Sequence, residues 1–362
     1  MTRTSLYAKN EIIRATLKET RERRKAETCK QYELKVDVSH LSRETLKALF
    51  VLFLEAKWFY NHVLAAANIF DTDYRIDRVK IKVRDHFETR DIVYLSSQMK
   101  QELIDRMQDG IRGLSRLKQK GHKVGWLKFK SEINSIPLKQ YGNTYKILDK
   151  HYVHIQGIKQ PFKVSGLSQI PKDAELASAL LLKKHGDYYL HVITYQTKVV
   201  PMHREEKQQL NSVGIDLGIK NQLTLSNGIR INYEVPISKR IRRLCKKLSR
   251  KKYHSRNWWK GKTKLEKAYE DTTNIKRDIR NKLVHKLTSH FHTICLQDDS
   301  IKTWQRIWGK RILNTSLGGI TSAIKRKART FSEVERGAPT TEECSRCGAK
   351  NKMGLNDRIY IC

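Results

Sequence analysis

The sequence predicts an α+β protein of several domains, in which a β-barrel interrupted by a helical insertion is followed by an α/β domain. Residues 32–38 alternate strictly between apolar and polar side chains, which is typical of a half-buried strand. Apolar residues then recur at helical spacing over 41–120, and residues 126–200 return to short segments separated by turn residues. The first strand and the later β-rich segment are expected to close one barrel around the insertion.

The expected domain boundaries follow these changes of pattern. Residues 1–30 predict a charged helical arm that is polar nearly all round, for which contact with RNA and partial disorder both remain open. The other expected boundaries are the barrel at 31–40 and 121–205, the helical insertion at 41–120, the α/β domain at 206–338, and a cysteine-containing segment at 339–362.

The charge of the chain favours a polyanionic partner. Lys and Arg outnumber Asp and Glu by 73 to 37, which gives a formal net charge of +36 among 362 residues. Neutralising phosphates releases their bound counterions, so nucleic acid is the partner that such an excess favours, with no preference between RNA and DNA. No run of about 18 apolar residues occurs, so we expect no membrane partner and a cytoplasmic, DNA-associated protein.

An acidic residue interrupts the short apolar strand 213–217. Asp216 stands there in the run Gly-Ile-Asp-Leu-Gly, where a carboxylate is costly unless it binds a cation or a hydrogen-bond donor. Gly214 and Gly218 allow a ligand or another backbone to come close. This is the pattern of the first strand of an RNase H-like nuclease, in which an Asp bridges two Mg²⁺ ions. A purely structural carboxylate is the alternative.

A basic helical hairpin is expected at 238–286, where 19 Lys and Arg face 4 Asp and Glu. A charge run is often a solvated face, but an excess of this size favours phosphate contacts. The residues expected to contact phosphates are Arg240, Arg242, Arg243, Lys246, Lys247, Lys251 and Lys252. Trp258 and Trp259 fall in the expected linker 253–261, and stacking on bases and burial in a core both remain open for them.

A pair of cysteines near the end of the chain indicates a zinc knuckle. Cys344 and Cys347 have the spacing of one half of a zinc ribbon, but only Cys362 follows and structural sites almost always hold four ligands. Zinc bound by these three cysteines therefore remains open. The other cysteines, Cys29, Cys245 and Cys295, are expected to be small buried hydrophobes.

Six landmarks in chain order resemble motifs of the TnpB family, the transposon-encoded ancestors of type V CRISPR effectors. The most specific is 213–221 with 225–228, which looks like the first RuvC motif. The other landmarks are 54–61, 95–98, 125–130, 238–244 and 339–348.

This resemblance implies a fold and a set of partners. It implies a wedge barrel with a helical recognition insertion, then a RuvC domain of RNase H type with a truncated zinc ribbon. It also implies one protein copy per guide RNA, a short motif read in duplex DNA beside the target, and specificity supplied by base pairing. The positions that match the motif-reading helices are Lys57, Tyr60, Asn61 and Gln98, for which packing or capping is the alternative.

The chain departs from the family at the catalytic acids. The position matching the second acid, a Glu, is Gln297, whose neutral amide holds Mg²⁺ far more weakly. Asp299 is expected on the same face of a strand at 293–301, about 7 Å further along, as a weak substitute. The third acid is expected beyond Cys362, and Asp357 does not match it. Mg²⁺ is therefore not expected to support cleavage by Asp216 alone.

The sequence thus predicts an RNA-guided DNA-binding protein that does not cut and is no longer an enzyme. It most resembles the nuclease-dead TnpB-like repressors called TldR, which block transcription by occupying a guide-matched promoter. Two other interpretations remain open. One is an active RNA-guided DNA endonuclease represented here by a shortened or altered sequence, and the other is a remnant that binds only its own RNA.

Overall fold

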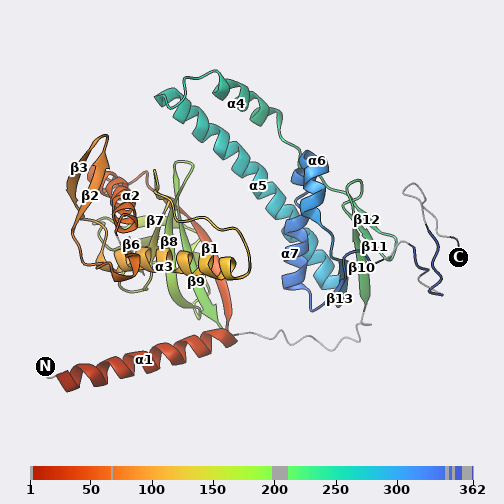
Figure 1. Cartoon of the computed structure of the whole chain (residues 1–362), viewed down its shortest axis with the longest axis horizontal. Coiled ribbons are helices and arrows are strands. Elements are labelled where there is room, and N and C mark those ends of the chain that lie inside the picture. Colours follow the sequence, from red (N-terminus) through yellow and green to blue (C-terminus); the bar gives the residue numbers. More distant parts are fainter. Residues whose placement is uncertain are drawn as a thin grey trace. The chain divides into compact units, whose positions relative to one another are not determined.

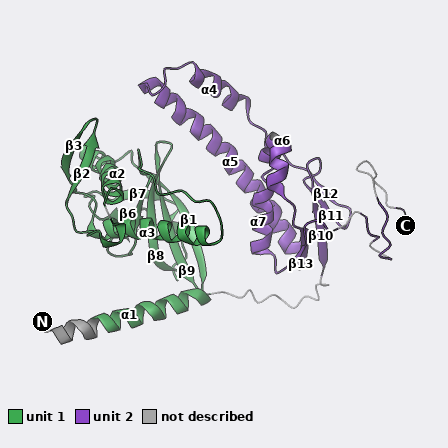
Figure 2. Ribbon diagram, viewed as in Figure 1, with its two compact units in different colours: residues 1–201 green, residues 202–362 purple. Residues whose placement is uncertain are grey.

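The computed structural model describes residues 3–66, 68–197, 211–338, 342–344, 347–352 and 361. The chain divides into two compact units, residues 1–201 and 202–362 (Figure 2). The elements of the first unit are α1 (Arg3–Ala26), β1 (Thr28–Asp37), α2 (Arg43–Leu64), the 3₁₀ helix η1 (Ile69–Asp71), β2 (Arg78–Val83), β3 (His86–Asp91), α3 (Ser97–Gln119), β4 (Ser135–Leu138), β5 (Tyr145–Ile147), β6 (Tyr152–Ile155), β7 (Phe162–Ser165), η2 (Leu167–Gln169), β8 (Glu175–Lys184) and β9 (Asp187–Gln196).

Seven strands of the first unit form a near-closed antiparallel barrel in the order β4-β8-β9-β1-β7-β6-β5 (Figure 1). The expected strand at 32–38 is β1, and it begins earlier because Thr28 already pairs with Gln196 of β9. Its alternation has the predicted effect: Leu34 and Val36 are buried while Lys35 is exposed. The strand therefore turns one face to the core, as period-two patterning requires.

The segment between β1 and β4 is an insertion that shares the hydrophobic core of the barrel. Apolar residues of α2 and α3 pack with Leu34 of β1 and with the other barrel strands in one continuous cluster. Ser42 and Ser96 cap the two helices, since each side chain accepts a hydrogen bond from a backbone N–H three residues later. The expectation of a purely helical insertion is wrong in one respect, because β2 and β3 form an antiparallel hairpin within it.

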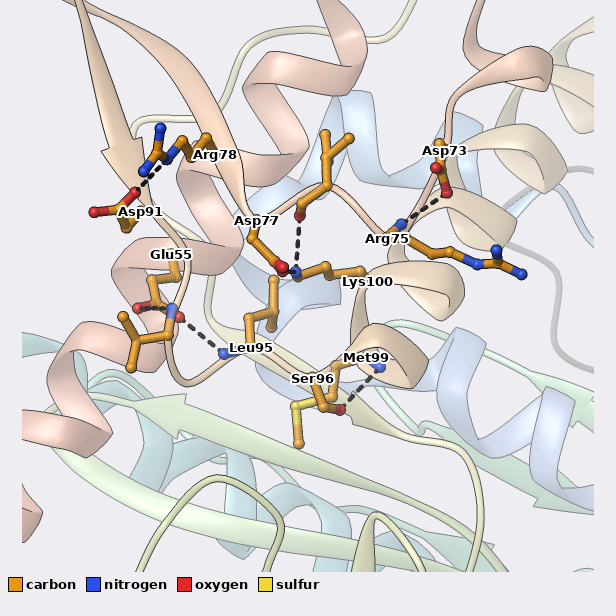
Figure 3. Close-up of polar contacts among 12 residues, drawn as sticks. Glu55, Asp73, Arg75, Asp77, Arg78, Asp91, Leu95, Ser96, Met99 and Lys100 are labelled. Carbon is orange, nitrogen blue, oxygen red and sulfur yellow. Dashed lines mark hydrogen bonds and ion pairs between the residues drawn. The ribbon is translucent and has the colours of Figure 1, made fainter.

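A buried carboxylate ties α2 to the chain that leads into α3 (Figure 3). Glu55 is 1% exposed, and its carboxylate accepts backbone N–H groups of Val93, Tyr94 and Leu95 at 2.9, 2.8 and 2.8 Å. Three donors satisfy the charge that burial would otherwise leave unpaired. Glu55 thereby positions the start of α3 against α2.

A buried ammonium ties α3 to the segment that leads into β2. Lys100 is 2% exposed, and its Nζ donates to the carbonyl of Ile76 at 2.8 Å and to the Asp77 carboxylate at 2.7 Å (Figure 3). The hydrogen bond from Lys100 and, after it, the positive charge of Lys100 lower the pKa of Asp77. Lys100 therefore satisfies two oxygens at once and fixes the first turn of α3 within the insertion.

The second unit contains a mixed sheet covered by helices. Its elements are β10 (Ser212–Leu217), β11 (Leu223–Leu225), β12 (Arg230–Ile231), α4 (Lys239–Ser249), α5 (Arg256–His290), β13 (Thr293–Gln297), α6 (Ile301–Thr315), α7 (Leu317–Lys327) and β14 (Thr330–Val334). The sheet order is β12-β11-β10-β13-β14, in which β10, β13 and β14 run parallel and β10, β11 and β12 antiparallel. Within the described ranges, no helix combines the length and apolar character that a membrane span needs.

The core of the second unit lies between this sheet and its helices. Val284 and Leu287 near the end of α5 pack with apolar residues of α7 and the sheet. The earlier part of α5 and the whole of α4 extend beyond that core as a helical hairpin (Figure 1). The Asn-Gly turn after β11 forms as predicted, with Gly228 at φ +86°, a conformation that favours glycine.

Three sequence expectations need correction. The strand expected at 293–301 ends at Gln297, because the chain turns there and α6 begins at Ile301. Trp258 and Trp259 lie in the first turn of α5 and not in a linker. Cys29 is exposed instead of buried, since it lies near the outer end of β1, away from the apolar face that begins at Leu34; Cys245 and Cys295 are half-buried.

Candidate nucleic-acid interface and acidic site

The acidic site of the second unit is formed where β10 and β13 run side by side. Their parallel register pairs Ile215 with Leu296, so Asp216 and Gln297 are the next residues on the two strands. Neighbouring residues in register project from the same face of a sheet, about 4.8 Å apart across the strands. Gln297 therefore stands beside Asp216, where the family resemblance places a Glu.

Other atoms of the protein fill the space beside Gly214 and Gly218, the glycines on either side of Asp216. Gly214 exchanges hydrogen bonds with Ser226, whose hydroxyl accepts the Gly214 N–H at 3.1 Å. A Cβ atom at Gly218 would lie 2.5 Å from the carbonyl oxygen of Asn221, so only glycine fits there. Of the two possibilities that the sequence left open at Gly218, close approach of another backbone is the one observed.

The polar side chains at the end of β13, next to Asp216, contact other parts of the second unit. The Gln297 amide donates from Nε2 to the carbonyl of Ala338 at 3.3 Å. Asp298 forms an ion pair with Arg336 at 2.9 Å. Gln297 is therefore a neutral neighbour of Asp216, and the Asp298 carboxylate is shared with Arg336.

Asp299 comes close to Asp216 by a different route from the one predicted. It does not continue the strand: its N–H bonds to the carbonyl of Gln297 at 3.0 Å, which turns the chain. Desolvation raises the pKa of Asp299, and the negative charges of Asp216 and Asp298 raise it further. Desolvation likewise raises the pKa of Asp216. The turn thus brings a second carboxylate within electrostatic range of Asp216.

The described residues of this site supply fewer carboxylates than two-metal hydrolysis uses. That chemistry needs a cluster of carboxylates holding two ions about 3.5–4 Å apart, and the site offers Asp216, Asp299 and a neutral amide. Among the residues that the structure describes, no group of three or more His, Cys, Asp or Glu side chains is arranged to hold a metal ion.

The basic hairpin presents most of its predicted cations to solvent. Arg242, Arg243, Lys246, Lys247 and Lys252 are exposed, and no ion pair engages them within the described part of the chain. Arg240 reaches Asp271 at 3.4 Å, and Lys251 donates to the carbonyl of Asn257 at 3.0 Å. Of α4, only Ile241 is buried. Such unpaired cations suit contact with phosphates.

Two of the predicted motif-reading residues on α2 form hydrogen bonds within the first unit. Tyr60 is 6% exposed, its hydroxyl donates to the carbonyl of Lys128 at 3.4 Å, and burial raises its pKa. Asn61 makes two hydrogen bonds with the backbone of Lys130, both at 2.9 Å. These contacts favour the packing alternative for Tyr60 and Asn61.

Lys57 and Gln98 are the remaining predicted readers. Lys57 is half-buried and lines a cavity of about 190 Å³ together with Phe50 and Lys183. Gln98 is also half-buried, and its amide donates to Gln140 at 3.2 Å. Contact of either side chain with DNA stays a prediction.

Backbone hydrogen bonds close a turn between Cys344 and Gly348. The Cys344 carbonyl accepts the N–H of Gly348 at 2.9 Å, and Glu343 and Lys350 form a β-bridge around the turn. Cys347 is exposed at this turn. Cys362 lies outside the described residues, so zinc binding by the three cysteines stays a prediction.

The chain is similar to a transposase family and to putative RNA-guided DNA endonucleases. A family model described as a probable transposase, OrfB_IS605, matches residues 192–301. The putative RNA-guided DNA endonuclease InsQ of Escherichia coli (strain K12) is 25% identical over 201 residues, which cover 49% of this chain and 49% of that protein. A putative RNA-guided DNA endonuclease of Streptomyces pristinaespiralis is 25% identical over 213 residues, 56% of this chain and 52% of the relative. The matched regions span about half the length of these curated relatives.

The fold comparison extends further along the chain. A chain in a cryo-EM structure of a Cas12f1–sgRNA–target DNA complex superimposes with a TM-score of 0.51 at 12% identity, over 90% of this chain and 92% of that one. The fold is therefore Cas12f-like. The family match at 192–301 contains Asp216, the basic hairpin and Gln297, so the acidic site and the hairpin lie within the matched segment.

Proposed function

We propose that this homologue of the TnpB and OrfB_IS605 proteins binds DNA at sites chosen by a guide RNA and does not cut them. The observation that carries the proposal is Gln297, which stands beside Asp216 on the neighbouring strand and donates its amide to Ala338. A neutral amide in the place of a carboxylate removes one of the charges that two-metal cleavage needs. The Asp298 carboxylate, paired with Arg336, does not replace it.

Binding does not depend on the acids that cleavage needs. Affinity for nucleic acid comes mainly from cations that neutralise phosphates, and specificity comes from base pairing with the guide. The exposed cations of α4 supply phosphate contacts in this proposal. A protein with this surface can hold a guide-matched site after its catalytic acids have been lost.

The finer roles follow from the same proposal. The barrel and its insertion act as the wedge and recognition region, and the second unit acts as a RuvC-like domain without cleavage activity. One protein copy holds one guide RNA, and occupancy of a guide-matched promoter beside a short motif represses transcription. Lys57 is the predicted motif reader that the internal hydrogen bonds leave most available.

One observation favours the alternative of an active RNA-guided DNA endonuclease. Asp299 lies close enough to Asp216 for the charge of Asp216 to raise its pKa, so two carboxylates share the site. In that alternative Asp299 takes over the role of the missing Glu. The two functions differ in the fate of the DNA at the bound site, which stays intact in the first and is cut in the second.

The deciding experiment is purification of the protein from cells that carry its natural locus. The bound RNA and the crosslinked DNA are sequenced, and DNA ends are mapped at each enriched site. We expect a discrete guide RNA, a matching DNA site and no breaks. Breaks at the guide-matched site that disappear in an Asp299→Asn variant would overturn the proposal in favour of the endonuclease, and the absence of any bound RNA would overturn both.

A further inference from the structure

Four aromatic rings cluster at the tip of the basic hairpin. The His254 ring stacks between Tyr253, at 3.9 Å between ring centroids, and Trp259, at 5.3 Å, with interplanar angles of 21° and 18°. Trp258 packs edge-on against both Tyr253 and Trp259, at 4.9 Å in each case. These four residues, the tip platform, form a short column of stacked rings with one ring bracing its side.

The local backbone is arranged to build the tip platform. His254 adopts a left-handed conformation, with φ at +60°, which is uncommon for residues with a side chain and places its ring in the column. Ser255 then caps α5 by accepting the Trp258 N–H at 3.1 Å, so both tryptophans fall in the first helical turn. A left-handed residue held at an exposed tip costs stability, which favours a functional role for the ring that it positions.

A glycine brings the two helices of the hairpin close together behind the tip platform. A Cβ atom at Gly261 would lie 3.2 Å from the Leu248 side chain and 3.4 Å from that of Lys251. Lys251 in turn donates to the carbonyl of Asn257. The turn that carries the rings is therefore braced from both helices.

The tip platform is too exposed to serve as a core. Tyr253 is 69% exposed and Trp259 is 45% exposed. The Nζ of Lys262 lies 4.8 Å from the Trp259 ring centre, and segment 235–265 contains no acidic residue. Exposed stacked rings among unopposed cations are the features by which proteins hold single-stranded nucleic acid, because every base has a face that can stack.

The polar edges of the rings indicate which nucleic acid fits. Within the described residues, no hydrogen bond engages the Tyr253 hydroxyl, the His254 ring nitrogens or the indole N–H groups of Trp258 and Trp259. These groups can donate to or accept from a ribose 2′-hydroxyl, which DNA lacks. Base stacking on aromatic side chains is also how unpaired RNA loops are recognised.

We infer that the tip platform binds an unpaired base of the guide RNA by continuing the column of stacked rings. The inference rests on the proposed function, since it assumes that the chain carries a guide RNA. Lys262 and the neighbouring cations hold the flanking phosphates, and the rings hold the base. The platform is sequence-tolerant, because stacking does not read the edges of a base.

The test measures binding of the full-length protein to a fluorescent single-stranded RNA, after co-purified nucleic acid has been removed. The RNA has about 12 nucleotides, within the ~4–16 nucleotides that one such site contacts. Tyr253→Leu and Trp259→Leu should each weaken binding by about 5- to 150-fold, the range for loss of one stacked base. The slope of log affinity against log salt should not change, because the phosphate contacts remain. Trp259→Phe keeps an aromatic face and should restore most of the affinity.

Matched probes and variants separate the possible outcomes. Phe87→Leu removes an aromatic ring of 70% exposure from the first unit and should leave RNA affinity unchanged. A DNA probe of the same sequence should bind more weakly and lose less affinity in the Tyr253 and Trp259 variants. Unchanged RNA affinity in those variants, a larger loss with DNA than with RNA, or failure of Trp259→Phe to rescue would each overturn the platform. If the unaltered protein bound neither probe, the proposed function itself would fail.

Discussion

The side chain at position 297 should set the affinity of the acidic site for a divalent cation. Replacing it with Glu sets a third carboxylate beside Asp216 and Asp299, and cation affinity rises with the number of anionic ligands. We expect Gln297→Glu to bind Mn²⁺ on the order of tenfold more tightly than the unaltered protein, measured by titration calorimetry. Gln297→Ala is the matched control and should bind no more tightly. Equal affinity in the Glu and Ala variants would show that the site cannot gather three acids.

Glu55 supports the first unit through three charge-assisted hydrogen bonds. Gln at this position can accept with one oxygen only, and its amide N–H₂ would face backbone donors. We expect Glu55→Gln to lower the free energy of unfolding by about 1.5–3 kcal/mol, measured by urea denaturation. Glu132→Gln, which changes an exposed Glu in the same unit, should cost well under that amount. Similar stabilities for the two variants would contradict the role of Glu55.

The ion pair of Asp77 with Lys100 predicts a dependence of stability on pH. Lys100 lowers the pKa of Asp77 below its ordinary value of 3.8, so the folded state favours the ionised carboxylate. The contribution is present above the ordinary value and is lost as pH falls through the lowered pKa. The stability difference between the unaltered protein and Asp77→Asn should therefore be constant near neutral pH and shrink below about pH 4. A difference that grows on acidification would reverse the assigned sign.

At the level of elements, the basic hairpin should bind phosphates without reading sequence. Changing Arg242, Arg243, Lys246 and Lys247 to Gln removes four exposed cations while leaving the only buried residue of α4, Ile241, in place. We expect weaker binding to every DNA sequence and a salt slope reduced by up to about 0.9 for each lost phosphate contact. The control replaces four exposed barrel lysines, Lys146, Lys150, Lys159 and Lys172. Equal loss of affinity in both sets would mean that net charge and not the hairpin governs binding.

The spacing of apolar residues predicted those elements that are determined by residues close together in the sequence. The alternation at 32–38 and the Asn-Gly turn depend on neighbours in sequence, and both formed as expected. The β2–β3 hairpin was not predicted, although Val79, Ile81 and Val83 alternate with charged residues, because it is a short element between two long helical patterns. The alternation was the signal that could have found it.

The acidic site could be predicted only in part. The pairing of Gln297 with Asp216 follows from two apolar strands that run parallel in one sheet. The approach of Asp299 depends on a turn after the strand, which no period describes. The internal contacts of Tyr60 and Asn61 likewise join α2 to a segment nearly seventy residues away, at Lys128 and Lys130. Sequence spacing carries no information about such long-range pairs.

At the scale of the whole molecule, repression and cleavage both silence a reporter, but only cleavage breaks its DNA. A reporter under a guide-matched promoter should lose expression while its DNA stays intact, because occupancy alone blocks transcription. Repression should survive Asp216→Asn combined with Asp299→Asn, since neither carboxylate contributes to binding, and it should weaken when the four hairpin cations become Gln. A scrambled guide is the specificity control. If the double Asn variant instead released the reporter, loss of expression would have required cutting, and the carboxylate pair would be an active site.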